Sequence, residues 1–238
     1  MLLYYVRHGD PVYRPDSLTP LGKRQAEALG RRLARYGLDE IYTSTSDRAI
    51  ETAVPVCELL KKEPVRLDFA HESLAWEQMT CVDTDGGRRW VFESNRFRNM
   101  AVTPEMRALG DAWYRHPAFA GMPLGEGIAR VRREAHAFLK GLGYHYEEEL
   151  GAYRAVEPND RRVALFAHQG FGLCFLSAVL DIPYPTVAAQ LDMSHSDLTV
   201  IEFRVLDGIS VPRMLTLSND AHLYAENLPT RYQNRLDF

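Results

Sequence analysis

The feature that most constrains the fold is a short apolar and aromatic segment without a polar interruption at residues 2–6. A strand with one face in water alternates apolar and polar side chains, whereas a strand buried on both faces of a parallel sheet is apolar throughout. A second segment of this kind spans residues 163–167. Together the two segments predict a largely parallel sheet that is covered by helices.

Helical segments follow the first strands along the chain. Thr19 and Pro20 supply an N-cap and a first-turn proline, and an apolar stripe of helical spacing then runs to Gly37. Residues 41–44 predict a second strand, and residues 47–60 predict a second helix. This β-α-β-α opening predicts an α/β fold, a three-layer α/β/α sandwich with a mostly parallel central sheet.

The rest of the chain predicts one domain over residues 1–238 with an inserted cap region at about residues 68–123. The cap is rich in aromatic and charged residues, and a helix is expected after Thr103-Pro104. The tail from Asn219 is polar, and we expect it to be irregular. The other expected elements are a helix at residues 125–146 and strands at residues 163–167, 198–203 and 211–217.

Composition limits the partners of the chain. A formal net charge of −4 gives no overall attraction for nucleic acid or an anionic membrane, so we expect neither partner. No stretch has the length and apolar content of a membrane-spanning helix. The cysteines lack metal-binding or disulfide-framework spacing and predict reduced thiols in the cytoplasm: Cys57, Cys81 and Cys174. The oligomeric state stays open, with a homodimer as one alternative.

Arg7, His8 and Gly9 follow the first strand directly. Open α/β sheets bind ligands at the carboxyl ends of their strands, so the position is a candidate site. A neutral imidazole can attack phosphorus, a guanidinium can neutralise phosphoryl oxygens, and a glycine allows backbone amides to approach an anion. The alternative is that the histidine and arginine are structural hydrogen-bonding residues at a strand end.

Two more strand ends carry similar side chains. Arg48 follows Ser44-Thr45-Ser46-Asp47 at the start of the second expected helix, where a helix N-terminus favours phosphate. His168 follows the strand at residues 163–167. Either residue alone could be an ordinary polar strand end. Three such ends at one sheet edge indicate a shared anion-binding crevice.

Four segments of the sequence resemble the histidine phosphatase superfamily, also called phosphoglycerate mutase-like: RHG, LTPLGKRQAEALG, TSTSDRAIETA and FAHQG. The likeness covers nearly the whole chain except residues 68–123. It implies a metal-independent phosphatase without a cofactor that acts on a small phosphomonoester. It also implies that His8 is the nucleophile and forms a phosphohistidine, with Arg7, Arg48 and His168 around the phosphate and Gly9 beside it.

The resemblance also implies a carboxylic acid that protonates the leaving oxygen. The matching region is HESLAWEQM, in which the spacing from Leu74 favours Glu77, with Glu72 as the competitor. This acid must be held protonated by burial or by the phosphate charge. The alternative for either glutamate is an exposed position in a polar loop.

Two other functions share the same fold. A mutase would return the phosphoryl group to a second hydroxyl, but the segment DPVYRPDSLTP lacks the serine and Trp-Asn pair that mutase relatives carry after RHG. A binding protein without turnover would not require the nucleophile. Structural roles are expected for Glu126, His195 and His222 and for the aromatic residues of the cap. The cap arginines Arg88, Arg89, Arg96 and Arg98 are expected to be solvated, with binding of a second anionic group as the alternative. Asp10 is either an orienting residue or a turn residue.

Overall fold

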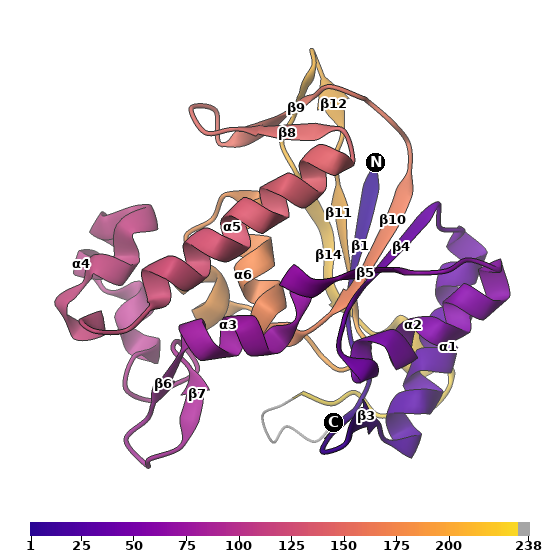
Figure 1. Cartoon of the computed structure of the whole chain (residues 1–238), viewed down its shortest axis with the longest axis horizontal. Helices are drawn as coiled ribbons and strands as arrows, with labels where there is room; N and C mark the ends of the chain where they lie inside the picture. The colour runs from indigo at the N-terminus through magenta and orange to yellow at the C-terminus, as the bar shows by residue number, and fades with distance from the viewer. Residues whose placement is uncertain (233–238) are drawn as a thin grey trace.

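The computed structural model describes residues 1–232 and has a six-stranded central sheet between two layers of helices (Figure 1). The strand order is β14-β11-β1-β10-β4-β5, and all neighbours are parallel except for the antiparallel strand β11. The predicted three-layer α/β/α class is therefore confirmed. The bounds of the strands are β1 (Leu2–Arg7), β4 (Glu40–Ser44), β5 (Val65–Leu67), β10 (Arg162–Ala167), β11 (Leu198–Glu202) and β14 (Arg213–Asn219).

Both faces of strand β1 are buried, which explains its apolar sequence. Tyr4 and Val6 belong to the core formed with α1 (Pro20–Tyr36) and α2 (Asp47–Leu60). Leu3 and Tyr5 belong to the larger core that includes residues of α5 (Leu124–Gly141) and α6 (Gln169–Leu180). Successive side chains of a strand point to opposite faces of the sheet, so each helical layer packs against one face of β1.

The first two helices begin and end where the sequence predicts. The Thr19 side chain accepts a hydrogen bond from the Gly22 backbone N–H, Pro20 is the first helical residue, and Gly37 ends the helix with a φ of 73°. Only glycine adopts such a backbone conformation without strain. Helix α2 starts at Asp47, whose negative carboxylate is stabilised by the positive N-terminal end of the helix dipole.

Residues 68–123 form a series of short elements between β5 and α5. Their aromatic side chains are mainly core residues: Phe92, Trp113 and Phe119 are buried, and they pack edge to face on one another. Tyr184 of α7 (Tyr184–Gln190) joins this cluster. The elements are η1 (Asp68–Ala70), α3 (Glu72–Met79), β6 (Thr80–Val82), β7 (Arg88–Trp90), η2 (Arg98–Val102), α4 (Pro104–Leu109), η3 (Gly110–Arg115) and η4 (Pro117–Phe119).

The expected helix at residues 125–146 is wrong at its end. Helix α5 stops at Gly141, and Gly143 takes a φ of 97°, which leads the chain directly into strand β8. This strand belongs to a small antiparallel sheet of order β12-β13-β9-β8, seen at the top of Figure 1. Its strands are β8 (Tyr144–Glu147), β9 (Ala152–Ala155), β12 (Val205–Leu206) and β13 (Ile209–Ser210).

The expected irregular tail is also wrong in part, because the short helix α8 (Ala221–Ala225) follows β14. Leu223 of α8 and Leu228 pack against Ala28 of α1, which gives the tail an apolar anchor. The last six residues of the tail, 233–238, lie outside the described residues. Within residues 1–232, no helix combines the length and the apolar content needed to cross a bilayer.

Candidate active site

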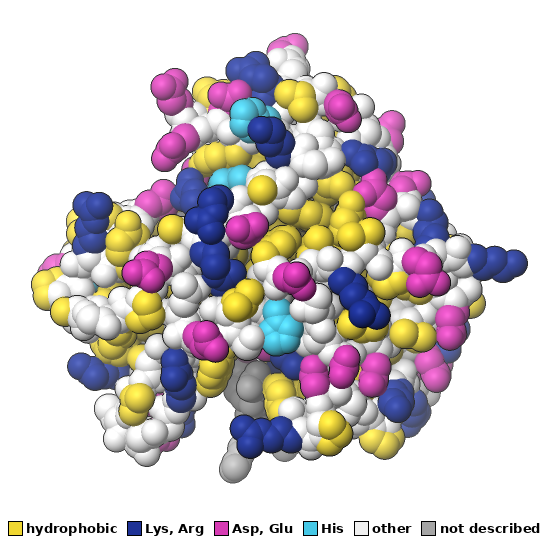
Figure 2. Space-filling model, in the orientation of Figure 1, with side chains coloured by type: hydrophobic (Ala, Val, Ile, Leu, Met, Phe, Trp, Pro, Cys, Tyr) yellow, Lys and Arg dark blue, Asp and Glu magenta, His cyan; other side chains and the backbone are white. Residues whose placement is uncertain are grey.

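The carboxyl ends of β1, β4 and β10 lie at one edge of the sheet. Strand pairing places Arg7 beside Ala167 and Phe166 beside Thr43, so the residues that follow these strands are brought together. Strand β11 is antiparallel to β1, which places the residues before β11 at the same edge. Figure 2 shows a notch at the lower side of the molecule, between the region of β6 and β7 and the region of the hairpin β2 (Pro11–Tyr13) and β3 (Asp16–Leu18).

His8 is held as a neutral imidazole. Its side chain is buried, and Nδ1 lies 2.7 Å from the Gly9 carbonyl oxygen, so Nδ1 carries the proton and donates it. The pKa of His8 lies well below its usual value because burial, Arg7 and Arg48 all disfavour the charged ring. Its Nε2 has no hydrogen-bond partner among residues 1–232 and keeps its lone pair for attack on an electrophile.

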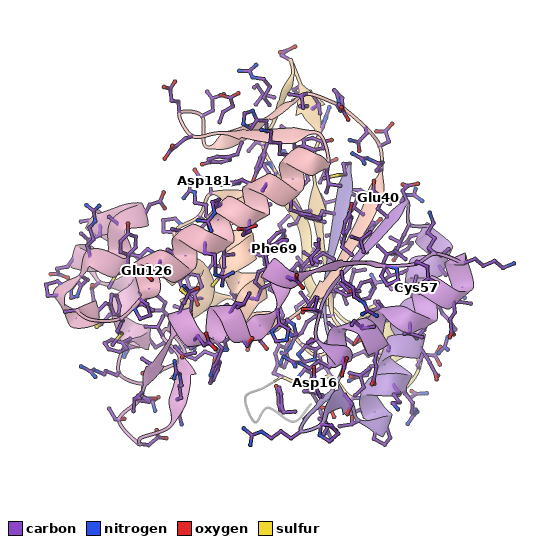
Figure 3. The ribbon with its side chains drawn as sticks, in the orientation of Figure 1. Asp16, Glu40, Cys57, Phe69, Glu126 and Asp181 are labelled. Carbon is purple, nitrogen blue, oxygen red and sulfur yellow. The ribbon has the colours of Figure 1, made fainter. Side chains whose placement is uncertain are left out.

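Arg48 is the centre of a charged cluster beside His8. Its guanidinium forms ion pairs with Asp16 at 2.8 Å and with Glu72 at 3.1 Å. Asp16 comes from β3 and lies at the lower side of the molecule, below the start of α2 (Figure 3). The buried Nε atom of Arg48 has no partner in the described part of the chain, which leaves a donor for an anion.

His168 contacts the same arginine. Its Nδ1 lies 3.1 Å from an Arg48 nitrogen and its Nε2 lies 2.9 Å from the Ser44 hydroxyl. An arginine nitrogen can only donate, so Nδ1 is the acceptor and Nε2 donates to Ser44. Burial, together with the neighbouring His8 and Arg48, lowers the pKa of His168 well below its usual value. The His8 and His168 rings are 5.2 Å apart.

The structure separates the two candidate acids. The Glu72 side chain is 17% exposed, and its Oε2 lies 3.1 Å from Arg48 and 3.5 Å from His168 Nδ1. Its Oε1 accepts the Gly170 backbone N–H at 3.2 Å. Glu77 is exposed, because five residues along a helix rotate a side chain by about 140°. The structure does not bring the favoured Glu77 to His8 and brings Glu72 instead.

Gly9 differs from its expected role. Its N–H donates to the Thr52 hydroxyl at 3.0 Å, so this amide is occupied. A Cβ atom on Gly9 would lie 2.7 Å from the Gly22 carbonyl oxygen, which shows how closely the loop after β1 approaches α1. Glycine is therefore required here for close backbone packing, and its carbonyl orients His8.

Sequence reasoning missed His195 as part of the site. His195 Nε2 lies 2.8 Å from a nitrogen of Arg7, and its Nδ1 lies 3.3 Å from Asp10. The His195 ring also stacks near His8, with centroids 5.9 Å apart. His195 Nε2 accepts from Arg7 while its Nδ1 side faces the Asp10 carboxylate, so the three residues lie in a row that positions the guanidinium. The position of His195 just before an antiparallel strand could have indicated this location.

Asp197 is a second residue that the sequence did not single out. It is fully buried, burial raises its pKa to about 7, and its Oδ1 lies 3.4 Å from the Arg7 backbone nitrogen.

The other expectations of structural roles agree with the geometry. Glu126 lies on α5, well away from Asp16 (Figure 3), and His222 is buried 3.3 Å from Arg32.

Three of these residues could also hold a cation. One donor atom each from His8, Glu72 and His168 lie within 4.8 Å of one another. The neighbouring guanidinium groups of Arg7 and Arg48 repel a metal ion and attract an anion. The site as a whole suits a dianionic group such as a phosphoryl group more than a cation.

Residues 3–99 of the chain match the family model described as histidine phosphatase superfamily (branch 1). This match supports the resemblance to the histidine phosphatase superfamily over residues 3–99. The resemblance found in the sequence is therefore confirmed. A similar curated protein, from Hydrogenobacter thermophilus, carries the provisional name phosphoserine phosphatase 2; it is 28% identical over 161 residues, which are 62% of this chain and 70% of that protein.

Solved structures with the histidine phosphatase fold are similar over nearly their whole length. A mycobacterial glucosyl-3-phosphoglycerate phosphatase in complex with VO3 has a TM-score of 0.57 and 21% identity, over 91% of this chain and 98% of that one. Phosphoserine phosphatase from Entamoeba histolytica in complex with 3-phosphoglyceric acid has a TM-score of 0.59 and 16% identity, over 93% and 98% of the two chains. At these sequence identities the structural similarity supports the assignment of the fold alone.

Proposed function

We propose that this histidine phosphatase hydrolyses a small phosphomonoester through a phosphohistidine at His8. The observation that carries the proposal is the state of His8, a buried neutral imidazole with Nδ1 held by the Gly9 carbonyl, beside Arg7 and Arg48. The names of the similar proteins, which are phosphatases of phosphoserine and of a glucosyl phosphoglycerate, support a phosphomonoester substrate.

In the first step His8 Nε2 attacks phosphorus while the bond from phosphorus to the ester oxygen breaks. Arg7 and Arg48 neutralise the phosphoryl oxygens, and Ser44 holds His168 beside them. Glu72 takes up a proton when the phosphoryl dianion binds beside it and replaces it as the partner of Arg48, and it gives this proton to the leaving oxygen, which departs as a neutral alcohol. Glu72 replaces Glu77 in this role because it is the glutamate that lies beside His168 and Arg48.

In the second step a water molecule attacks the phosphohistidine. The ionised Glu72 accepts the proton of this water, the bond between phosphorus and Nε2 breaks, and inorganic phosphate leaves. The enzyme returns to its starting protonation state. The positive charge that a metal ion supplies in other phosphatases comes from arginine here, so we propose that the reaction needs no metal.

The reaction is tested by phosphate release from a panel of phosphomonoesters, with acid-stable and acid-labile protein-bound phosphate measured after a rapid quench. Wild-type protein should release phosphate and yield acid-labile phosphoprotein, while His8→Ala should do neither. The control is His145→Ala, because His145 is exposed on β8, in the small sheet at the opposite end of the molecule. Full turnover by His8→Ala would exclude the mechanism, and interconversion of phosphoglycerates without phosphate release would identify a mutase.

A cytoplasmic location is also proposed. Cys57, Cys81 and Cys174 are free and buried in the structure, as expected for a protein of a reducing compartment.

Residues 68–123 are proposed to act as the cap, since Glu72 lies near the start of this segment and reaches the site from it. Nucleic acid and membranes are not proposed as partners, on the grounds of the net charge of −4.

A further inference from the structure

A pocket of about 340 Å³ in the cap carries charges of both signs. Its acidic side chains are Glu93 and Asp192, and its basic side chains include Arg88 and Arg98. Trp76 and Trp90, which pack edge to face at 5.3 Å, form an aromatic wall. We call this space the mixed-charge pocket.

The mixed-charge pocket lies beside the site of His8. Trp76 is one helical turn after Glu72 on α3, so the two side chains share one face of the helix. Asp192 precedes Met193, whose carbonyl accepts a hydrogen bond from the Arg7 guanidinium. Glu93 is bonded to Gln169, the residue that follows His168. Three of the residues that line the pocket are therefore linked to residues of the phosphate site or their chain neighbours.

The two carboxylates of the pocket converge on one nitrogen atom. Gln169 Nε2 donates to Glu93 at 2.9 Å and to Asp192 at 3.1 Å. Neither carboxylate forms an ion pair with lysine or arginine in the part of the chain that the structure describes. Burial raises the pKa of Glu93, and Asp192 and Glu72 add to this rise while Gln169 and Arg7 oppose it. An ammonium group bound here would compensate the paired negative charges.

Gln169 gives an independent indication of a ligand. The residue is 4% exposed, and its Oε1 atom has no hydrogen-bond partner among the described residues. The amide oxygen shares a carbon atom with Nε2 and so lies near both carboxylates. A buried acceptor without a partner destabilises the folded state, and an N–H donor of a ligand would satisfy it.

The basic side chains differ in how far they are already engaged. Arg89 is paired with Asp85 at 2.6 Å, and Arg88 donates to the Thr80 hydroxyl and to the Glu77 carbonyl. The guanidinium of Arg98 makes no hydrogen bond or ion pair with residues 1–232, although it lines the pocket. Arg98 is therefore the arginine with its planar donors available to a carboxylate.

We propose that the mixed-charge pocket holds the alcohol part of the substrate and selects phosphomonoesters whose alcohol carries both an ammonium group and a carboxylate. Glu93 and Asp192 bind the ammonium group, with the Gln169 amide behind them as their shared hydrogen-bond donor, and Arg98 binds the carboxylate. This inference rests on the proposed phosphatase reaction, because the pocket acts on the ester that His8 attacks. It assigns a zwitterionic alcohol as the leaving group.

The test compares four small esters that differ in these two groups. O-phosphoserine carries both, phosphoethanolamine only the ammonium group, 3-phosphoglycerate only the carboxylate, and glycerol phosphate neither. We expect kcat/KM for O-phosphoserine to exceed that for each singly charged ester by about tenfold or more, the effect of one charge-assisted hydrogen bond. Similar values for all four esters, with phosphate released from each, would overturn the pocket assignment and leave the phosphatase reaction standing.

Variants then assign each charge to its residue. Glu93→Gln and Asp192→Asn should each lower the ratio of kcat/KM for O-phosphoserine over 3-phosphoglycerate by about tenfold, since only the first ester has an ammonium group. Arg98→Gln should lower the ratio for O-phosphoserine over phosphoethanolamine by a similar factor. The matched control is Arg96→Gln, because Arg96 packs over the Phe97 ring and does not line the pocket.

The outcomes separate the two proposals. Unchanged ratios in Glu93→Gln, Asp192→Asn and Arg98→Gln would refute the pocket assignment if phosphate release still depends on His8. Release of phosphate from none of the four esters, together with the absence of phosphohistidine, would instead refute the proposed reaction. Far-ultraviolet circular dichroism and a thermal melt of each variant distinguish lost selectivity from lost folding.

Discussion

Replacing Glu72 by glutamine gives the sharpest test of the site geometry. Glutamine keeps the shape of the side chain, and its single amide oxygen can accept either the Gly170 N–H or the Arg48 donor, but it has no acidic proton. The matched control is Glu77→Gln, which changes the same chemical group on the same helix α3 at an exposed position. The pair therefore separates the loss of a general acid from the loss of a negative charge.

The expected size of the effect follows from the role of the proton. General acid catalysis contributes about 10²–10⁴-fold, so kcat for an alkyl phosphomonoester should fall by that factor in Glu72→Gln. This loss corresponds to about 3–5 kcal/mol of activation free energy. The free energy of unfolding should change by only about 1 kcal/mol, because Asp16 still pairs with Arg48 in the variant.

The assay varies the leaving group as well as the protein. A phenol with an electron-withdrawing substituent leaves without needing a proton, so the loss of kcat in Glu72→Gln should be much smaller for an aryl phosphate than for an alkyl phosphate. Glu77→Gln should lose less than about twofold with either substrate, as is usual for an exposed side chain away from the reaction.

Any one of three results would refute this reasoning. The first is a kcat in Glu72→Gln close to that of wild-type protein with an alkyl ester. The second is a large loss in Glu77→Gln, which would mean that α3 turns to present Glu77 during turnover. An equal loss for alkyl and aryl esters would show that Glu72 acts on phosphate binding rather than on the leaving oxygen.

Three further predictions follow from the packing and electrostatics of the same region. His8 and His168 have pKa values below the usual 6.5 in the folded state. Below pH 6.5 the unfolded chain therefore binds more protons than the folded chain does. The free energy of unfolding should then decrease as pH falls from 6.5, by up to about 1.4 kcal/mol per pH unit for each histidine. Urea unfolding at several pH values measures this slope, and an unchanged slope in His168→Gln would argue against a neutral buried His168. Phosphate release should change by less than about twofold after EDTA treatment or on addition of Mg²⁺, since arginine supplies the positive charge; loss of activity restored by a metal would contradict the proposed mechanism. Gly170→Ala should lower the free energy of unfolding by about 1–3 kcal/mol, because its Cβ would lie 2.0 Å from the Trp90 ring. The control Gly141→Ala has no atom within 4 Å of its Cβ and should not destabilise the protein. Thermal melts in which Gly141→Ala is the less stable variant would refute this packing.

The strands and helices that build the main sheet could be predicted from local sequence. The apolar segment at β1 had to be buried on both faces, and the Thr19, Pro20 and Gly37 signals fixed α1 because caps and φ preferences act within a few residues. Helix α5 was extended too far, since the apolar side chains after Gly141 fit both a helical period and the alternation of β8. Short-range patterns cannot distinguish these alternatives.

The sequence also determined which residues follow the strand ends, namely Arg7, His8, Arg48 and His168. Their convergence follows from the order of parallel strands, which is a rule of topology. Only the tertiary structure decided which glutamate joins them: Glu72 and Glu77 lie on one short helix, and the packing of α3 against α5 and α6 buries one side of it. The rotation of a helix about its axis depends on its packing partners, which lie far away in sequence.

The tertiary structure likewise placed His195 beside Arg7 and assembled the mixed-charge pocket. The residues of this pocket come from α3, from the segment around β7 and from the loop after α7, and Trp76 and Asp192 are more than a hundred positions apart along the chain. Their charges interact only because folding brings them within a few ångströms in a region of low dielectric constant. Local sequence determines the elements and the chemical groups, whereas the distances between distant charges, which control binding and pKa, exist only in the folded chain.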